Sequence, residues 1–163
     1  MIKIFSIAII YFSLVFSDVL EGYILYTPSL DHTAIDEDAD HTTFLMDNDH
    51  NVINTWTHDC KPSSIPYLLP DSSLVYPCNE TAFSPLNGGN GPLGGRVVKY
   101  SWDGEIVWDF NIATSTMQPH HDIEVLNNGN ILMLAYEKVS VEEAQAFGME
   151  SISSGLEYII PCK

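Results

Sequence analysis

The feature that most constrains how this chain can fold is an internal repeat. Residues 44–56 and 98–110 share one pattern, in which two short apolar strands flank an Asp-containing turn and an aromatic residue closes the second strand. Asp103 corresponds to Asp49 in this alignment. Apolar residues that alternate on both sides of a turn are typical of a β-hairpin. A repeated hairpin of this kind buries its apolar faces by stacking one copy on the next.

A second hairpin follows the first in each copy of the repeat. Residues 65–75 align with residues 122–132, so that Asn128 corresponds to Asp71. The spacing between the two turns is slightly longer in the second copy, which therefore has extra residues in its middle loop. Each copy contains two hairpins, which predicts four short strands per unit.

Four-stranded units at this spacing predict an all-β fold of the β-propeller type. The blade-like units span about residues 42–78 and 95–138. Propellers typically contain roughly four to eight blades, whereas this sequence contains about two. We therefore expect residues 18–163 to form a partial β-propeller domain, the N-terminal part of a longer protein.

Segments outside the two units have their own patterns. Residues 22–27 predict a short strand, and residues 83–95, which are rich in Gly, Pro and Asn, predict a loop between the units. Residues 141–148 predict a short helix that Gly148 ends. Residues 156–160 predict the first strand of a third unit.

The N-terminal segment is typical of a secretory signal peptide. Lys3 precedes an apolar run over residues 4–16, and Val15 and Ser17 are small residues at the expected positions before a cleavage site. A transmembrane helix needs about 20 apolar residues, so a retained N-terminal anchor is the second interpretation. Cleavage of residues 1–17 predicts a periplasmic or secreted protein with no membrane contact.

The net charge excludes one class of partner. The chain has 6 basic and 22 acidic residues, for a formal net charge of −16. Nucleic-acid binding needs Lys and Arg side chains at the phosphates, and so does adsorption to an anionic membrane. We expect neither, and we expect the acidity to serve solubility.

The cysteines suggest one disulfide and no metal site. Cys60 and Cys78 bracket a strand-like segment, and export permits a bridge between them, which would leave Cys162 over. No CxxC spacing occurs, so the sequence predicts no zinc site, and it indicates no other metal or cofactor.

The best candidate for a functional site is His120, His121 and Asp122, directly before a predicted strand. Adjacent residues point to opposite faces of a strand, so we expect at most one histidine to face a site. Asp122 is placed to orient a neighbouring imidazole through a carboxylate hydrogen bond. The aligned positions of the first unit hold Ser63 and Ser64, so the repeat itself does not require histidine there. The alternative is a histidine that only satisfies a turn.

Other aromatic and basic side chains receive structural interpretations. Four further histidines lie in predicted polar loops and are assigned no role: His32, His41, His50 and His58. The three tryptophans are interpreted as packing residues: Trp56, Trp102 and Trp108. Arg96 is expected to begin a strand and not to reach the candidate site.

Taken in order, several of these segments resemble bacterial arylsulfotransferases. Residues 22–26, 45–56, 95–108 and 120–126 occur in the order seen in that family, and the resemblance covers roughly residues 22–138. It implies a six-bladed propeller in the periplasm. Such enzymes transfer a sulfuryl group from a phenolic sulfate ester to a phenol acceptor through a covalent histidine intermediate, without a cofactor.

The resemblance also bears on the site. It implies that His120 or His121 matches a histidine of the central channel, while the histidine that takes the sulfuryl group belongs to a later blade. We therefore expect this chain by itself to be inactive. The alternative function is a non-catalytic, secreted β-propeller module that binds protein or glycan, since a fold can persist without its chemistry.

Overall fold

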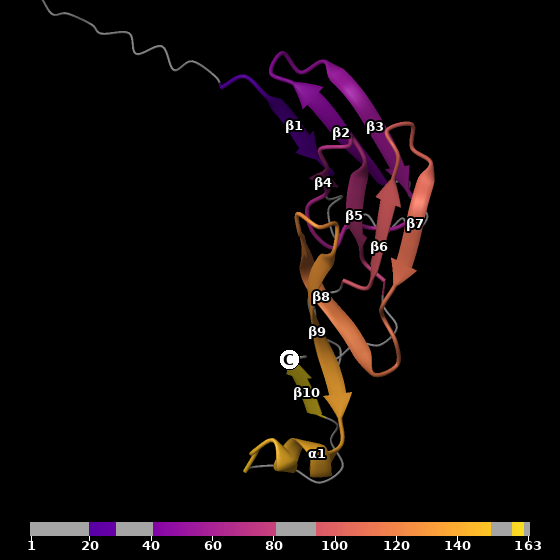
Figure 1. Ribbon diagram of the computed structural model, residues 1–163. Helices are drawn as coiled ribbons and strands as arrows, with labels where there is room; N and C mark the ends of the chain where they lie inside the picture. The colour runs from indigo at the N-terminus through magenta and orange to yellow at the C-terminus, as the bar shows by residue number, and fades with distance from the viewer. Residues whose placement is uncertain (1–19, 29–40, 81–93, 151–157, 162–163) are drawn as a thin grey trace, which may run out of the picture.

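The chain folds mainly into β-strands. The computed structural model describes residues 20–28, 41–80, 94–150 and 158–161, and within them lie ten strands and one helix. The expectations for residues 1–17 and 83–93, and for His32 and Cys162, lie outside the described residues. The strands form three antiparallel sheets, none of which closes on itself (Figure 1). The all-β class is confirmed.

The three sheets follow one another along the chain. The first has the order β1 (Tyr23–Tyr26), β2 (His41–Asp47), β3 (Val52–His58). The middle sheet has the order β4 (Tyr67–Leu68), β5 (Leu74–Cys78), β6 (Arg96–Tyr100), β7 (Ile106–Asn111). The third has the order β10 (Tyr158–Pro161), β9 (Ile131–Val139), β8 (Met117–Val125).

The first hairpin of the repeat is reproduced residue by residue. The β2–β3 register has an irregularity between Leu45 and Met46, and the β6–β7 register has one at the aligned position, between Lys99 and Tyr100. The turn residue His50 has φ 64°, and its counterpart Gly104 has φ 85°. The same bulge and the same left-handed turn position therefore recur in both copies.

The second hairpin repeats in the same way. Tyr67 pairs with Val75 in β4–β5, and their aligned counterparts Glu124 and Leu132 pair in β8–β9. The left-handed turn residue is Ser72 in one hairpin, with φ 64°, and Gly129 in the other, with φ 84°. The alignment predicted from the sequence is thus also a structural alignment.

The hairpins are combined into sheets differently from our expectation. We expected residues 42–78 to form one four-stranded unit, but β2–β3 and β4–β5 belong to different sheets. Instead β5 pairs with β6 over five residue pairs, from Leu74↔Tyr100 to Cys78↔Arg96. The four-stranded middle sheet thus joins the second hairpin of one unit to the first hairpin of the next. A sequence period gives the length of a repeat and leaves open where the sheet boundary falls.

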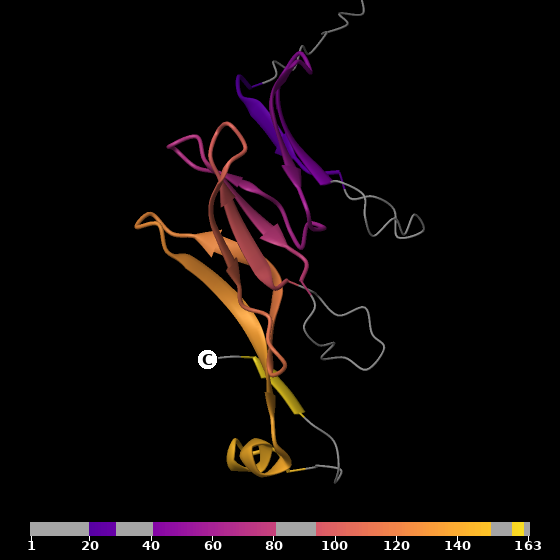
Figure 2. The ribbon, with the colours of Figure 1, turned by 90° about the vertical axis from the view of Figure 1, so that its right-hand side faces the viewer.

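Figure 2 shows the middle sheet between the first and the third. Two apolar clusters hold the sheets together, one on each face of the middle sheet. Leu45 and Trp56 of the first sheet pack with Tyr76 and Val98 of the middle sheet. Ile123 of the third sheet packs with Val75 and Val97 on the opposite face. Because each sheet is covered on the faces that meet, burial of these side chains supplies the main stabilisation.

Local features of the ends agree with the sequence. The helix α1 (Val141–Ala146) begins with a capping box, in which Ser140 accepts from the Glu143 amide, and Gly148 follows it with φ 95°. Strand β10 pairs with β9, as expected for the first strand of a further unit. Cys60 and Cys78 form a disulfide, with a Cα–Cα distance of 5.7 Å. No helix in the described ranges is long and apolar enough to cross a membrane.

Candidate functional site

The candidate site lies on a wide bulge in β8. Pro119 pairs with Ala135 and Ile123 pairs with Met133, so residues 120–122 stand opposite Leu134 alone. The histidines are therefore within the strand and not before it, because β8 already begins at residue 117. The bulge makes room for a left-handed residue, and His121 has φ 46°. That conformation is uncommon for any residue other than glycine, and it concentrates at functional positions.

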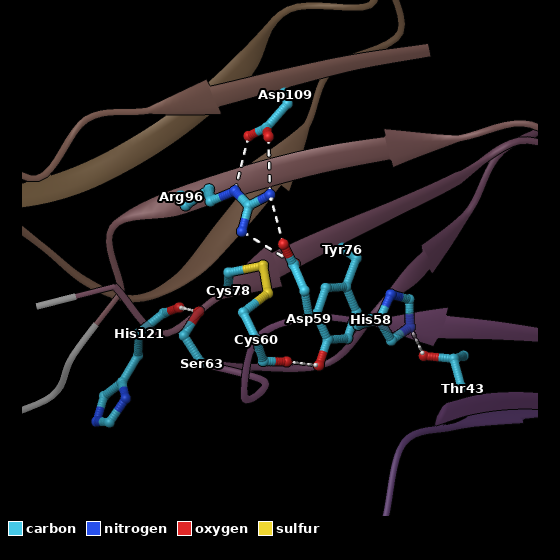
Figure 3. Close-up of a disulfide and its surroundings, with 10 residues drawn as sticks. All are labelled: Thr43, His58, Asp59, Cys60, Ser63, Tyr76, Cys78, Arg96, Asp109 and His121. Atoms are coloured by element: carbon cyan, nitrogen blue, oxygen red, sulfur yellow. Dashed lines mark hydrogen bonds and ion pairs between the residues drawn. A yellow bond between two sulfur atoms is a disulfide. The ribbon is translucent and has the colours of Figure 1, made fainter. Parts of the chain in front are cut away.

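The bulge is held by the segment just before β4, which corresponds in the repeat to the start of the bulge. Ser63 Oγ donates a hydrogen bond to the carbonyl oxygen of His121 at 2.9 Å, as Figure 3 shows. Ser64 Oγ donates to Asp122 Oδ1 at 2.8 Å. Ser63 and Ser64 are the aligned counterparts of His120 and His121. The corresponding segments of the two units thus lie side by side, with the contacts displaced by one residue.

Asp122 fixes the backbone of the bulge. Its Oδ1 also accepts from the Ile123 amide at 2.9 Å and from the Tyr67 hydroxyl at 3.1 Å. Burial raises the pKa of Asp122, but the hydrogen bonds from Ser64, Ile123 and Tyr67 outweigh it and hold that pKa below its usual value. Burial and the nearby carboxylate together raise the pKa of Tyr67 to about 12. Within the described residues Asp122 makes no hydrogen bond to an imidazole, so its contacts are those of an anchor and not of the orienting group that we expected.

The two imidazoles are oriented differently. Their ring centroids lie 5.0 Å apart with the planes at 83°. His120 is half-buried, with its ring 5.1 Å from that of Tyr136, whereas His121 is exposed. In Figure 3 the His121 ring points away from Ser63 and from the disulfide. Of the pair, His121 is the more exposed side chain.

A glutamine that the sequence did not single out ties the start of β8 to the middle sheet. Gln118 is fully buried, and its Nε2 donates to the carbonyl oxygen of Glu80 at 3.0 Å and to that of Gly94. The Gly94 amide in turn donates to the Pro119 carbonyl oxygen at 3.0 Å. The neighbouring Gly95 leaves no room for a side chain, since a Cβ there would lie 2.3 Å from the Glu80 carbonyl oxygen. The Gly-rich composition of residues 83–95 was the sequence signal that could have pointed to this close packing.

The nearby cations are engaged elsewhere. Arg96 begins β6, as expected, and forms ion pairs with Asp59 at 3.0 Å and with Asp109 at 2.8 Å (Figure 3). Lys99 forms an ion pair with Asp71 at 3.2 Å. The bidentate contact with Asp109 contributes most to the raised pKa of Arg96. Both cations are thus neutralised by carboxylates, away from the β8 bulge.

Two histidines that we had placed in polar loops are core residues. His41 and His58 pair across β2 and β3, and they are 5% and 1% exposed. The His58 ring stacks on Tyr76 at a centroid distance of 3.5 Å, and its Nε2 lies 2.8 Å from Thr43 Oγ1. Burial, reinforced by the neighbouring His41, lowers the pKa of His58 to about 4. The sequence missed this because its polar neighbours suggested a loop, whereas the sheets close over the side chain.

These features define an all-β protein of stacked antiparallel sheets with an imidazole pair on a strand bulge. In the described part of the chain, no group of three or more His, Cys, Asp or Glu side chains could hold a metal ion. Neither a family model, nor a curated protein, nor a solved structure matches this chain. Function is therefore inferred from the geometry of the β8 bulge and from the family resemblance of the sequence.

Proposed function

We propose that this chain is part of an arylsulfotransferase-like β-propeller and that the β8 bulge forms one wall of its aryl sulfate site. One observation carries the proposal. Corresponding segments of the two units meet with a displacement of one residue, where Ser63 contacts His121 and Ser64 contacts Asp122. In a propeller, corresponding segments at the first strand of each blade surround the central channel.

The chemistry of the bulge suits a sulfate ester. Sulfuryl transfer resembles phosphoryl transfer, in which positioning and stabilisation of charge on the oxygens supply most of the catalysis. An imidazole can donate a hydrogen bond to such an oxygen or act as a nucleophile. We assign His121 to contact the sulfuryl oxygens, because it is exposed and directed outward, and His120 to support it.

The ion pairs of Arg96 and Lys99 favour a limited role for this chain. Arg96 and Lys99 are both engaged by carboxylates, so we assign the contacts with the sulfuryl oxygens to imidazole and not to these two cations. In the family the histidine that takes the sulfuryl group lies in a later blade. The chain alone then binds an aryl sulfate weakly and does not transfer its sulfuryl group. If an aryl sulfate does not bind, the second candidate function, a binding module for protein or glycan, takes its place.

The test is to titrate the chain with 4-nitrophenyl sulfate and to follow the 15N signals of the histidine rings by NMR. Shifts confined to His120 and His121 are expected, and His121→Asn should reduce them at least several-fold. Asparagine tolerates the left-handed backbone, so this variant removes the imidazole alone. His50→Asn is the matched control, because His50 is also exposed with positive φ and lies in a distant turn. Saturable binding of a glycan with no response to the sulfate ester would instead support the binding module.

A further inference from the structure

Asp122 is anchored through one of its two carboxylate oxygens. Three donors converge on its Oδ1, namely the Ser64 hydroxyl, the Tyr67 hydroxyl and the Ile123 amide. A carboxylate accepts at about four lone-pair positions, which are divided between its two oxygens. Within the described residues no donor reaches Asp122 Oδ2, and Asp122 forms no ion pair. Because Asp122 is exposed, Oδ2 can accept a ligand while Oδ1 keeps its anchoring contacts.

Other aspartates of the described chain use both oxygens for structural contacts. In the β2–β3 turn, Asp47 accepts from the Asp49 and Asn51 amides through Oδ1 and from the Asn51 side chain through Oδ2. Four aspartates are engaged through both oxygens in this way: Asp47, Asp59, Asp71 and Asp109. Asp122 differs from them, because anchoring of the bulge accounts for only one of its oxygens.

The uncommitted oxygen belongs to an ionised carboxylate next to the exposed imidazole of His121. Burial raises the pKa of Asp122, but the hydrogen bonds on Oδ1 and the nearby His121 outweigh it and hold that pKa below its usual value. The three donors on Oδ1 also restrict how the carboxylate group can turn, so Oδ2 is held in a defined position. An ionised oxygen accepts a strong hydrogen bond from a hydroxyl group and repels an anion.

We propose that Asp122 is a specificity-determining residue, whose Oδ2 binds the hydroxyl group of a neutral ligand beside His121. The contact is a hydrogen bond, in which the ligand hydroxyl donates and Oδ2 accepts, and no covalent bond changes. Phenols and sugars both carry such a hydroxyl group. The inference rests on the proposed function for the location of the site and adds a second class of ligand to it.

The test is an NMR titration of the chain with phenol, anisole and methyl glucoside, following the amide signals of residues 120–123. Phenol or methyl glucoside should give saturable shifts, and the one that responds identifies the source of the hydroxyl group. Anisole has the same ring as phenol but no hydroxyl donor, so it should give no comparable shift.

Asp122→Asn separates the two oxygens, because the amide oxygen can keep the three contacts of Oδ1 while an NH2 donor replaces Oδ2. This variant should weaken binding of the hydroxyl ligand roughly tenfold, since a charge-assisted hydrogen bond is lost. It should at the same time tighten binding of 4-nitrophenyl sulfate, because a negative charge is removed. A purely structural role of Asp122 would weaken both ligands together. Asp49→Asn, in the exposed β2–β3 turn, is the matched control and should change neither affinity.

Three outcomes would overturn the inference. They are anisole binding as tight as phenol binding, no binding of either hydroxyl compound, and unchanged binding of the hydroxyl compound by Asp122→Asn. The comparison of phenol with anisole uses the unmodified chain, so it decides the matter even if Asp122→Asn does not fold. Absence of 4-nitrophenyl sulfate binding alongside phenol binding that Asp122→Asn weakens would instead count against the proposed function alone.

Discussion

Two pairs of histidines in this molecule have the same residue type and opposite environments. His41 and His58 face each other across β2 and β3 and are enclosed between the first and middle sheets. His120 and His121 lie next to each other on the bulge of β8, where one ring is half-buried and the other exposed. The first pair contributes packing, and the second presents imidazole at the surface of the bulge. The comparison shows that a histidine's role follows from how the sheets enclose it.

The largest expected difference between the pairs is in stability. His58→Ala should lower the free energy of unfolding by about 3 kcal/mol, because it leaves a cavity against Tyr76 and removes the buried hydrogen bond with Thr43. His121→Ala should change it by less than about 0.5 kcal/mol, as at most exposed positions. Equilibrium urea unfolding of the two variants measures both values. Equal losses of unfolding free energy in the two variants would contradict the difference in burial between His58 and His121.

The pH dependence of stability should sharpen the same contrast. Burial lowers the pKa of His58 to about 4 in the folded state, against 6.5 when unfolded. Between these values the unfolded chain binds more protons, so stability is complete above about pH 6.5 and falls as the pH decreases toward 4. The loss should be about 2 kcal/mol. Urea midpoints at pH 7.5 and 4.5 measure it.

The control for this prediction is His58→Gln, which keeps a polar partner for Thr43 but does not titrate. Its stability should depend less on pH than that of the unmodified chain across the same interval. A variant that retains the full dependence would assign the titration to other groups.

The smallest expected effects distinguish His120 from His121. His121→Gly should stabilise the chain by about 0.5 kcal/mol, because relief of the left-handed conformation at φ 46° slightly exceeds the added freedom of glycine when unfolded. His120→Gly should instead destabilise it by about 0.5 to 1 kcal/mol, since that residue has no positive φ. Thermal unfolding of the two variants side by side compares them. Destabilisation of equal size in both would contradict a strained bulge.

Much of the local structure could be predicted from the repeat. The hairpins, their turns, the helix before Gly148 and the Cys60–Cys78 bridge all depend on residues close in sequence or on a simple period. The sheet boundaries could not be predicted, because the pairing of β5 with β6 connects two units and a period has no defined starting point. The wide bulge of β8 was also missed, since strand periodicity assumes regular pairing.

For the candidate site, the sequence marked the right segment and misjudged its parts. His120, His121 and Asp122 do lie together, and Ser63 and Ser64 were noted as their counterparts. That the two sets touch is a tertiary fact, because a repeat alignment does not say which equivalent positions become neighbours. The hydrogen bonds that Asp122 accepts from Ser64 and Tyr67 also join residues far apart in the sequence, so the repeat did not predict them. Gln118 was missed because a buried glutamine has no local pattern.

The sequence by itself determined the all-β class, the two-hairpin repeat and the hairpin registers, because these follow from the alternation of side chains and from turn residues within a few positions of each other. Only the tertiary structure decided which hairpins share a sheet and which histidines are enclosed. Those outcomes depend on contacts between residues far apart in the chain. The burial of His58 and the exposure of His121 are two results of one such arrangement.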